Sequence, residues 1–202
     1  MGGERVTMIT AMNDAATDDE HISILRAATE ADYPAVANAL QTWWTQPGLD
    51  TPSAARERAA LVPRLWLQHF ATTSVIAERG EQLHGFLIAL YSQDRQDEGY
   101  IHFVGVAPSQ RGRGIGRRLY ERFFETCRAA GRSWVRCVTS PTNTVSIGFH
   151  EAMGFAIERS SGAIAKPDYD GPGVPRVAFV RSTSPTVVDP SGRGHGVPRV
   201  DG

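Results

Sequence analysis

The chain has 202 residues, of which 41% are hydrophobic and 21% are charged, and its formal net charge at pH 7 is −1. These values are typical of a soluble globular protein, and they argue against a general nucleic-acid binder, which would carry a clear excess of positive charge. No apolar run approaches the roughly 20 residues that span a bilayer, and the first residues lack the basic and apolar regions of a secretory signal. We therefore expect a cytoplasmic protein with no membrane or nucleic-acid partner.

The cysteines and histidines do not indicate a metal centre. Cys127 is expected on a helix and Cys137 on a strand, so they have neither the spacing of metal ligands nor that of a disulfide framework. The six histidines are scattered, with no pair four residues apart beside an acidic partner. We expect two buried free thiols and no metal.

The two ends of the chain differ in composition from its middle. Residues 1–21 are polar, small and acidic, and residues 183–202 are rich in Pro and Gly. Such segments bury too little apolar surface to fold. We expect disordered ends and a single folded domain over residues 22–182.

Hydrophobic periodicity predicts the elements of that domain in chain order. Residues 22–26 alternate as a strand does, and a helix follows over 29–44, beginning at the N-cap Thr29. A second helix is expected over 54–70, with a kink at Pro63. The remaining expected elements are strands over 74–78, 83–91 and 100–106, a helix over 115–130, a strand over 133–139, a helix over 143–153 and a strand over 177–181.

The connections between these elements define the sheet. A short turn over 79–82 joins two strands into an antiparallel hairpin, and strand 100–106 continues this meander. The helix over 115–130 is a crossover, so the strands before and after it are parallel. The sequence therefore predicts an α/β (α+β) fold, with a mixed, mostly antiparallel central sheet flanked by helices.

The most informative segment is the loop that follows strand 100–106. Gly112, Gly114 and Gly116 alternate there, so several unhindered backbone N–H groups converge on the positive end of a helix. Such an arrangement binds phosphate. The spacing lacks the third glycine of a dinucleotide fingerprint, because Arg117 holds that position, and no Gly-Lys-Ser/Thr triplet of a P-loop follows.

Positive charge is concentrated around this loop. Eight arginines lie between Arg111 and Arg136, opposed there only by Glu121 and Glu125. The general use of Arg in this chain, where Lys166 is the single lysine, explains the residue type but not the uneven distribution of charge. A small basic footprint fits an anionic ligand with several phosphates better than a nucleic-acid duplex.

Two segments resemble the GNAT superfamily of acyl-CoA-dependent N-acetyltransferases. The first is Arg111-x-x-Gly114-x-Gly116, which is similar to the pyrophosphate loop of that family. The second runs from Asn143 to Phe155 and looks like the family's helix that begins at Asn and ends at Gly-Phe. The resemblance covers roughly residues 22–181, and it implies the GNAT fold, in which one parallel strand pair splays apart at the cofactor site.

The resemblance also implies how the cofactor, acetyl-CoA, would bind. Backbone groups of Val104 and Val106, unpaired in the splayed region, would bond the pantetheine amides as an added strand does. The amides of the loop would hold the pyrophosphate, and Arg117 or Arg118 would reach the outer phosphates unless they form only a solvated helix face. The loop residues with this implied role are Arg111, Gly112, Arg113, Gly114, Ile115 and Gly116.

The helix over 143–153 carries a polar stripe of Asn143, Ser146 and His150. By resemblance, Asn143 and Ser146 lie at the cofactor and His150 faces its sulfur, with a plain helix cap as the alternative for Asn143. His150 stands where the family most often has Tyr, and it would either protonate the departing thiolate or serve as a structural imidazole. The apolar residues expected to pack on the other face are Val145, Phe149, Ala152 and Met153.

An amine acceptor must lose its proton before it attacks. The family often uses a carboxylate on the strand before the loop, or a chain of waters, for this step. Glu98 and His102 are the candidates in this chain. The alternative roles are a solvated loop residue for Glu98 and a half-buried strand residue for His102.

By the same resemblance, two segments would recognise the acceptor. The first holds Trp43, Trp44, Asp50 and Arg56, and the second is Tyr169–Gly173. Two adjacent tryptophans cannot both face the core of one helix, so at least one would wall a pocket unless both pack at an interface. The acidic N-terminal half of the chain favours a small cationic amine.

We therefore predict an N-acetyltransferase that moves the acetyl group of acetyl-CoA to a primary amine of a small molecule, by direct attack in a ternary complex and without a covalent intermediate. The alternative is a catalytically weak module that senses acyl-CoA. A nucleotide-dependent enzyme is disfavoured because the fingerprints of such enzymes are missing. A homodimer is expected only by analogy with the family.

Overall fold

The computed structural model describes residues 23–44, 51–159 and 162–184. The strands in this part of the chain are β1 (Ile24–Ala27), β2 (Val75–Arg79), β3 (Gln82–Tyr91), β4 (Glu98–Val106), β5 (Trp134–Thr139), β6 (Ala156–Ile157), β7 (Ala165–Lys166) and β8 (Arg176–Ser182). They form one sheet in the order β1-β2-β3-β4-β5-β8-β6, with β7 also paired to β8. Among the described pairs only β4 and β5 are parallel, which confirms the predicted mixed, mostly antiparallel sheet.

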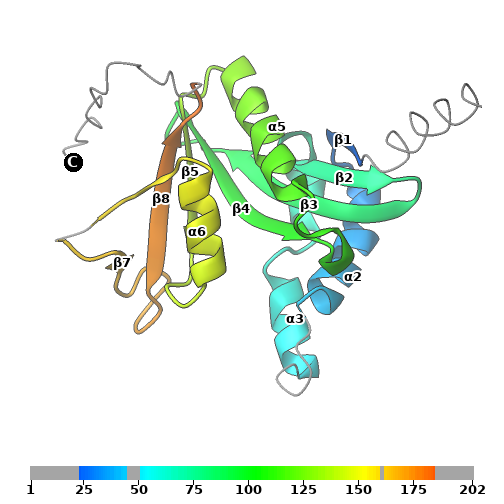
Figure 1. Cartoon of the computed structure of the whole chain (residues 1–202), viewed down its shortest axis with the longest axis horizontal. Coiled ribbons are helices and arrows are strands. Elements are labelled where there is room, and N and C mark those ends of the chain that lie inside the picture. Colours follow the sequence, from blue (N-terminus) through cyan, green and yellow to red (C-terminus); the bar gives the residue numbers. More distant parts are fainter. Residues whose placement is uncertain (1–22, 45–50, 160–161, 185–202) are drawn as a thin grey trace, which may run out of the picture.

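Helices cover both faces of the sheet. They are α2 (Tyr33–Thr42), α3 (Pro52–Ala60), α4 (Leu65–His69), α5 (Ile115–Ala129) and α6 (Thr144–Ala152). In Figure 1, α5 and α6 lie in front of the sheet and α2 lies behind it. One core cluster joins Phe123 of α5 to Val135 of β5, and the other joins Leu40 of α2 to Phe86 of β3. None of these described helices is long and apolar enough to cross a membrane.

Helix α5 fixes the position of the glycine loop. It begins after Gly114, whose φ of 77° lies in the left-handed region that favours glycine. It ends at Ala129 and is followed by the cap Ala130 and then by Gly131, which has a φ of 71°. The side chains that anchor it to the sheet recur at helical spacing and are all buried: Ile115, Leu119, Phe123 and Cys127. The loop is thereby held at the C-terminal end of β4.

Strands β4 and β5 are paired only where both begin. Their matched residues are Glu98 with Trp134, Gly99 with Val135 and Tyr100 with Arg136. Beyond them, β4 continues to Val106 and β5 to Thr139 with no further pairing between the two. Figure 1 shows β4 diverging from β5 toward the start of α5. We call this opening the β4–β5 splay.

Several elements differ from the prediction. The helix expected over 54–70 is divided into α3 and α4, because Pro63 has no N–H for a helical hydrogen bond. The helix expected from residue 29 begins as a 3-10 turn over Glu30–Asp32, where the Asp32 carboxylate accepts the backbone N–H of Thr29. Strands β6 and β7 have two residues each, too few to show a period. The expected N-terminal extension and nearly all of the expected C-terminal tail lie outside the described residues.

Candidate active site

The open side of the β4–β5 splay presents backbone groups of β4 that face no strand. Ala107, directly after β4, donates its N–H to the carbonyl of His84 in β3 at 2.9 Å. Backbone groups alternate in direction along a strand, so those of Val104 and Val106 point away from β3 and into the splay. An extended, amide-bearing ligand would find hydrogen-bond partners along this edge.

The glycine loop provides an open, positively polarised surface at one end of the splay. Gly112 and Gly114 both have a φ of 77°, and a Cβ built on either would meet no atom within 4 Å. No side chain in the described part of the chain caps the N-terminus of α5, and no acidic residue lies in its first turn. The first N–H groups of α5 are therefore available to an anion.

The Arg111 side chain braces the loop from within. Its Nη2 donates to the carbonyl oxygen of Trp43 at 2.9 Å, and its Nε donates to that of Val106 at 3.3 Å. These bonds tie the loop to the end of α2 and to the end of β4. Arg111 thus contributes its backbone, rather than a free guanidinium, to the candidate phosphate site.

The other loop arginines have different surroundings. Arg118 donates to the carbonyl of Ser23 at 2.8 Å and is thereby directed toward the segment before β1. Arg117 is more than half exposed and lies 3.7 Å from Glu121, and Arg113 is exposed. Arg113 and Arg117 are therefore the loop side chains able to reach an outer phosphate.

Asn143 caps α6. Its Oδ1 accepts the backbone N–H of Ser146 at 3.1 Å, which is the helix-cap role. Its side-chain amide N–H groups have no partner among the described residues, and the residue is exposed. Asn143 can therefore cap the helix and donate to a ligand at the same time. The Ser146 hydroxyl lies 3.3 Å from Nδ1 of His150.

His150 lies in the core, whereas its spacing placed it on an accessible polar stripe. It is 4% exposed and its ring stacks on Phe179. Its Nδ1 donates to the carbonyl of Ser146 at 2.7 Å, and its Nε2 accepts from the hydroxyl of Tyr120 at 3.0 Å. Burial lowers the pKa of His150, so the ring is neutral at neutral pH. Of the residues expected to pack, Met153 is buried and Phe149 packs against the core, whereas Val145 and Ala152 are exposed.

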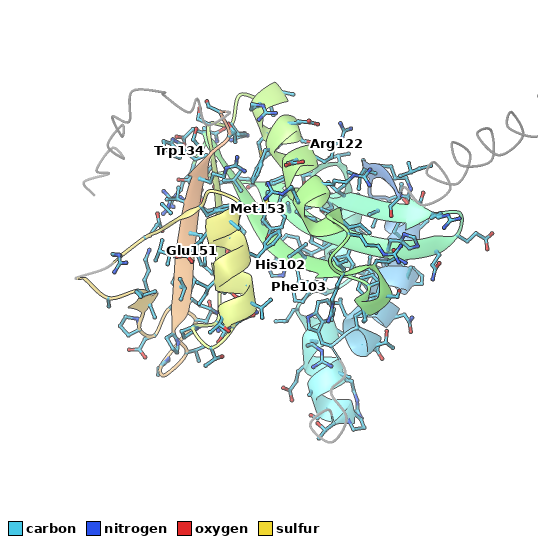
Figure 2. The ribbon with its side chains drawn as sticks, in the orientation of Figure 1. His102, Phe103, Arg122, Trp134, Glu151 and Met153 are labelled. Carbon is cyan, nitrogen blue, oxygen red and sulfur yellow. The ribbon has the colours of Figure 1, made fainter. Side chains whose placement is uncertain are left out.

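His102 occupies a bulge in β4. The register between β3 and β4 shifts at this point and leaves His102 as an extra residue. Its ring stacks on Trp66, with 4.2 Å between centroids, and its Nε2 lies 2.6 Å from the carbonyl oxygen of Leu61. Nε2 must therefore carry the proton, which leaves the lone pair on Nδ1. Figure 2 shows His102 and Phe103 near the centre of the molecule.

Glu98 is the first residue of β4, not part of a solvated loop. Its side chain is 11% exposed and lies 2.7 Å from Nε of Arg136. Arg136 also pairs with Glu158, which lies 3.1 Å from Nζ of Lys166. Arg95 approaches the second oxygen of Glu98 at 3.4 Å. These groups form one ion-pair chain that links β4 and β5 to β7.

The ion-pair chain lines a cavity of about 340 Å³, which we call the apex cavity. A Cβ on Gly99 would meet Cys127 of α5, so the neighbouring side chains of Glu98 and Tyr100 point to the opposite face of the sheet. Tyr100 lines the cavity and, with Arg136, forms the last matched pair of β4 and β5. The apex cavity therefore lies where the splay closes, on the face away from α5.

Only one residue of the second predicted acceptor segment, Tyr169, lines this cavity. Burial raises the pKa of Tyr100, and Tyr169 hydrogen bonds to it. Arg136, Glu158 and Lys166 were not predicted at a site. They meet through the pairing of β8 with β5, β6 and β7, and the two-residue strands left no periodic signal in the sequence.

The tryptophans of the first predicted acceptor segment pack against the core. Trp43 and Trp44 are both half-buried and join the core cluster of Phe86. This is the interface alternative considered for the pair. Arg56 is exposed on α3, and Asp50 lies outside the described residues.

Both cysteines are free and buried, as predicted. Burial raises the pKa of the Cys127 thiol to about 12 and raises that of Cys137 as well. Neither thiol is ionised at neutral pH, so neither is poised as a nucleophile. Within the described ranges, no group of three or more His, Cys, Asp or Glu could hold a metal ion.

Residues 33–155 match the sequence model of the acetyltransferase (GNAT) family. The chain belongs to this family. The match contains both segments that carry the resemblance, the glycine loop and the helix that begins after Asn143. The prediction of an acyltransferase is thereby confirmed for this GNAT chain.

Curated relatives of this GNAT chain include two diaminobutyrate enzymes. The chain is 25% identical over 140 residues to the L-2,4-diaminobutyric acid acetyltransferase of Shouchella clausii. The aligned region covers 68% of this chain and 75% of the relative. The chain is 32% identical over 99 residues to the protein of the same name from Nocardia farcinica, which covers 49% of each. The chain thus spans three quarters of the first relative and about half of the second.

Solved GNAT structures share the fold. A GNAT-family protein of Desulfovibrio desulfuricans superposes with a TM-score of 0.63 at 19% identity, covering 80% of this chain and 99% of that one. The yncA protein of Salmonella typhimurium, solved with its cofactor acetyl-CoA, superposes with a TM-score of 0.56 at 17% identity, covering 89% and 99%. The predicted GNAT fold is confirmed.

Proposed function

We propose that this chain transfers the acetyl group of acetyl-CoA to a primary amine of a small molecule, by direct attack within a ternary complex. The observation that carries the proposal is the geometry of the β4–β5 splay. The splay is open at the end that holds the glycine loop, and the apex cavity lies at its closed end on the other face. A donor and an acceptor that enter from opposite faces would meet at the apex. The named diaminobutyrate relatives support an amine acceptor.

The residues around the splay fit acetyl-CoA. Loop amides from Arg111 to Gly116 would hold its pyrophosphate, and the exposed Arg113 and Arg117 would reach its outer phosphate. The free edge of β4 at Val104 would bond the pantetheine amides as a neighbouring strand does. When bound, acetyl-CoA supplies a thioester carbonyl that an amine can attack.

His102 is the better candidate for the general base. Its Nδ1 keeps a free lone pair, because Nε2 is committed to the carbonyl of Leu61. Both oxygens of Glu98 already face arginines. In the proposed step, the ammonium proton of the acceptor passes to Nδ1 of His102, directly or through water. The amine nitrogen then bonds to the acetyl carbon, and the C–S bond breaks to release CoA as its thiolate. The nitrogen loses its second proton to this thiolate or to water, which leaves the neutral amide.

His150 is a positioning residue in this scheme. Its Nδ1 proton is used by Ser146 and its Nε2 accepts from Tyr120, so it has no proton directed at a ligand. It joins α6 to α5 and thereby sets the position of Asn143 beside the splay. CoA is a fair leaving group as a thiolate, so a proton donor at this point is not required.

The test is release of CoA thiol from acetyl-CoA over a panel of primary amines, together with direct measurement of acetyl-CoA binding by calorimetry. Gly114→Glu places a carboxylate where the pyrophosphate would lie. Gly80→Glu is a matched control, because Gly80 also has a positive φ of 57° and open surroundings but lies in the turn between β2 and β3. We expect Gly80→Glu to bind and turn over normally and Gly114→Glu to bind at least about tenfold more weakly.

Two outcomes would contradict the proposal. Unchanged acetyl-CoA binding by Gly114→Glu would show that the loop does not hold the pyrophosphate. Tight binding of acetyl-CoA by the unmodified chain, without turnover of any amine, would replace the enzyme with a module that senses acyl-CoA.

A further inference from the structure

The apex cavity holds more positive than negative charge. Arg95, Arg136 and Lys166 line it, and the carboxylates that line it are those of Glu98 and Glu158. Glu98 faces both arginines, and Glu158 faces Arg136 and Lys166. Two carboxylates are thus shared among three cations, so the lining carries one positive charge that its own carboxylates do not balance.

Lys166 is the lining cation best placed to bind a ligand. Its ammonium has three N–H donors, and one of them is used by Glu158 at 3.1 Å. Its side chain is 33% exposed, whereas that of Arg136 is 18% exposed and is held between two carboxylates. Arg95 is 63% exposed and so lies at the rim. Lys166 is therefore both accessible from the cavity and incompletely paired.

We infer that the acceptor carries a carboxylate as well as its reactive amine, and that Lys166 binds this carboxylate. The inference rests on the proposed acetyl transfer and names its substrate class, a small diamino acid. With the carboxylate at Lys166, the far amine extends toward Tyr100 and Arg136, where the splay closes. The charge-assisted hydrogen bond between Lys166 and the carboxylate, made in a partly desolvated cavity, should make the diamino acid bind more tightly than the same amine without the carboxylate.

Matched acceptors that differ only in the carboxylate test the inference. The pairs are 2,4-diaminobutyrate with 1,3-diaminopropane, ornithine with 1,4-diaminobutane, and lysine with 1,5-diaminopentane. We expect the carboxylate member of at least one pair to have a kcat/KM about tenfold higher or more. If the plain diamine is as good or better in every pair, the inference is wrong and acetyl transfer stands. If no amine of the wider panel is acetylated, the proposed function itself fails.

A variant separates binding of the carboxylate from a structural role. Lys166→Met should raise KM for the preferred diamino acid about tenfold, while kcat and the KM of its paired diamine change by less than about twofold. Lys166→Arg should recover part of the loss. Arg122→Met is the matched control, since Arg122 is an exposed cation on the surface of α5. Equal effects on both members of the pair would show that Lys166 only stabilises the fold and would overturn the inference.

Direct binding gives a readout that is independent of turnover. Lys166 is the only lysine in the chain, so ¹³C-labelled lysine yields one residue's set of NMR signals. With CoA present, the diamino acid should shift these signals at concentrations where the paired diamine leaves them in place. Two results would contradict contact between Lys166 and the carboxylate. One is equal shifts of the Lys166 signals with the diamino acid and with its paired diamine, and the other is no shift with a diamino acid that the enzyme acetylates.

Discussion

Replacing Tyr120 with Phe removes one hydroxyl from the core and tests how His150 is held. Tyr120 is 1% exposed, and its hydroxyl lies 3.0 Å from Nε2 of His150. Without this hydroxyl, Nε2 becomes a buried acceptor with no partner, because Nδ1 is already bonded to Ser146. Leaving such a group unsatisfied costs about 1–3 kcal/mol. In a protein of this size, that loss lowers Tm by roughly 2–12 °C.

A double-mutant cycle measured by urea unfolding isolates this interaction. Tyr120→Phe and His150→Phe each leave one buried polar group unpaired, whereas the double variant leaves none. The double variant should therefore cost less than the sum of the two single variants, by about 1–3 kcal/mol. The larger side chain at position 150 is present both in His150→Phe and in the double variant. Its effect on the free energy of unfolding therefore cancels in the cycle when that effect does not depend on the residue at position 120.

Tyr91→Phe is the matched control for this cycle. The Tyr91 hydroxyl donates to the carbonyl of Thr126 at 3.0 Å in a partly buried position, and that carbonyl also accepts the N–H of Ala130. Its loss should cost under about 1 kcal/mol. The reasoning is refuted if the variants at Tyr120 and His150 are additive, or if Tyr120→Phe costs no more than Tyr91→Phe.

Three further predictions concern stability. Burial lowers the pKa of His150 below the unfolded value of about 6.5, so the unfolded state binds more protons as the pH falls below that value. The free energy of unfolding should decrease from pH 7 to pH 5, and urea titrations should show a smaller decrease for His150→Phe. Arg136→Met removes one of the two cationic partners of Glu98 and of Glu158, which keep only Arg95 and Lys166, and should cost about 1–3 kcal/mol, measured as a lower urea midpoint. An unchanged midpoint would contradict the ion-pair chain. Gly99→Ala places a Cβ 2.6 Å from Sγ of Cys127 and should lower the free energy of unfolding by about 1–3 kcal/mol. Adding Cys127→Ala to the same chain should restore part of this loss. Full stability of the single variant would show that α5 can shift.

Local patterns predicted the parts of the site that depend on backbone conformation. The alternating glycines and the apolar spacing from Ile115 onward placed a loop and a helix start where the structure has them, because left-handed φ values and helical periodicity are properties of neighbouring residues. The parallel pairing of β4 and β5 followed from the helical crossover between them.

Side-chain partners could not be predicted in the same way. The spacing of His150 placed it on a polar stripe, but Tyr120 of α5 and Phe179 of β8 enclose it. Glu98 was expected as a candidate general base or as a solvated loop residue, but Arg136 pairs with it from 38 residues away. Both outcomes depend on which helices and strands pack together in the fold. The hydrophobic periodicity of one segment carries no information about such long-range contacts.

The short joint between β4 and β5 divides the sheet into two half-sheets, β1–β4 and β5–β8, that meet over three residue pairs. The apex cavity draws Tyr100 from one half-sheet and Arg136 and Lys166 from the other. A ligand arm lodged between the two would contact both and fix the angle at the joint, and that angle determines the width of the cavity. For the proposed acetyl transfer we therefore expect ordered addition, in which the thioester donor binds first and the amine then binds to a cavity whose walls are already in place.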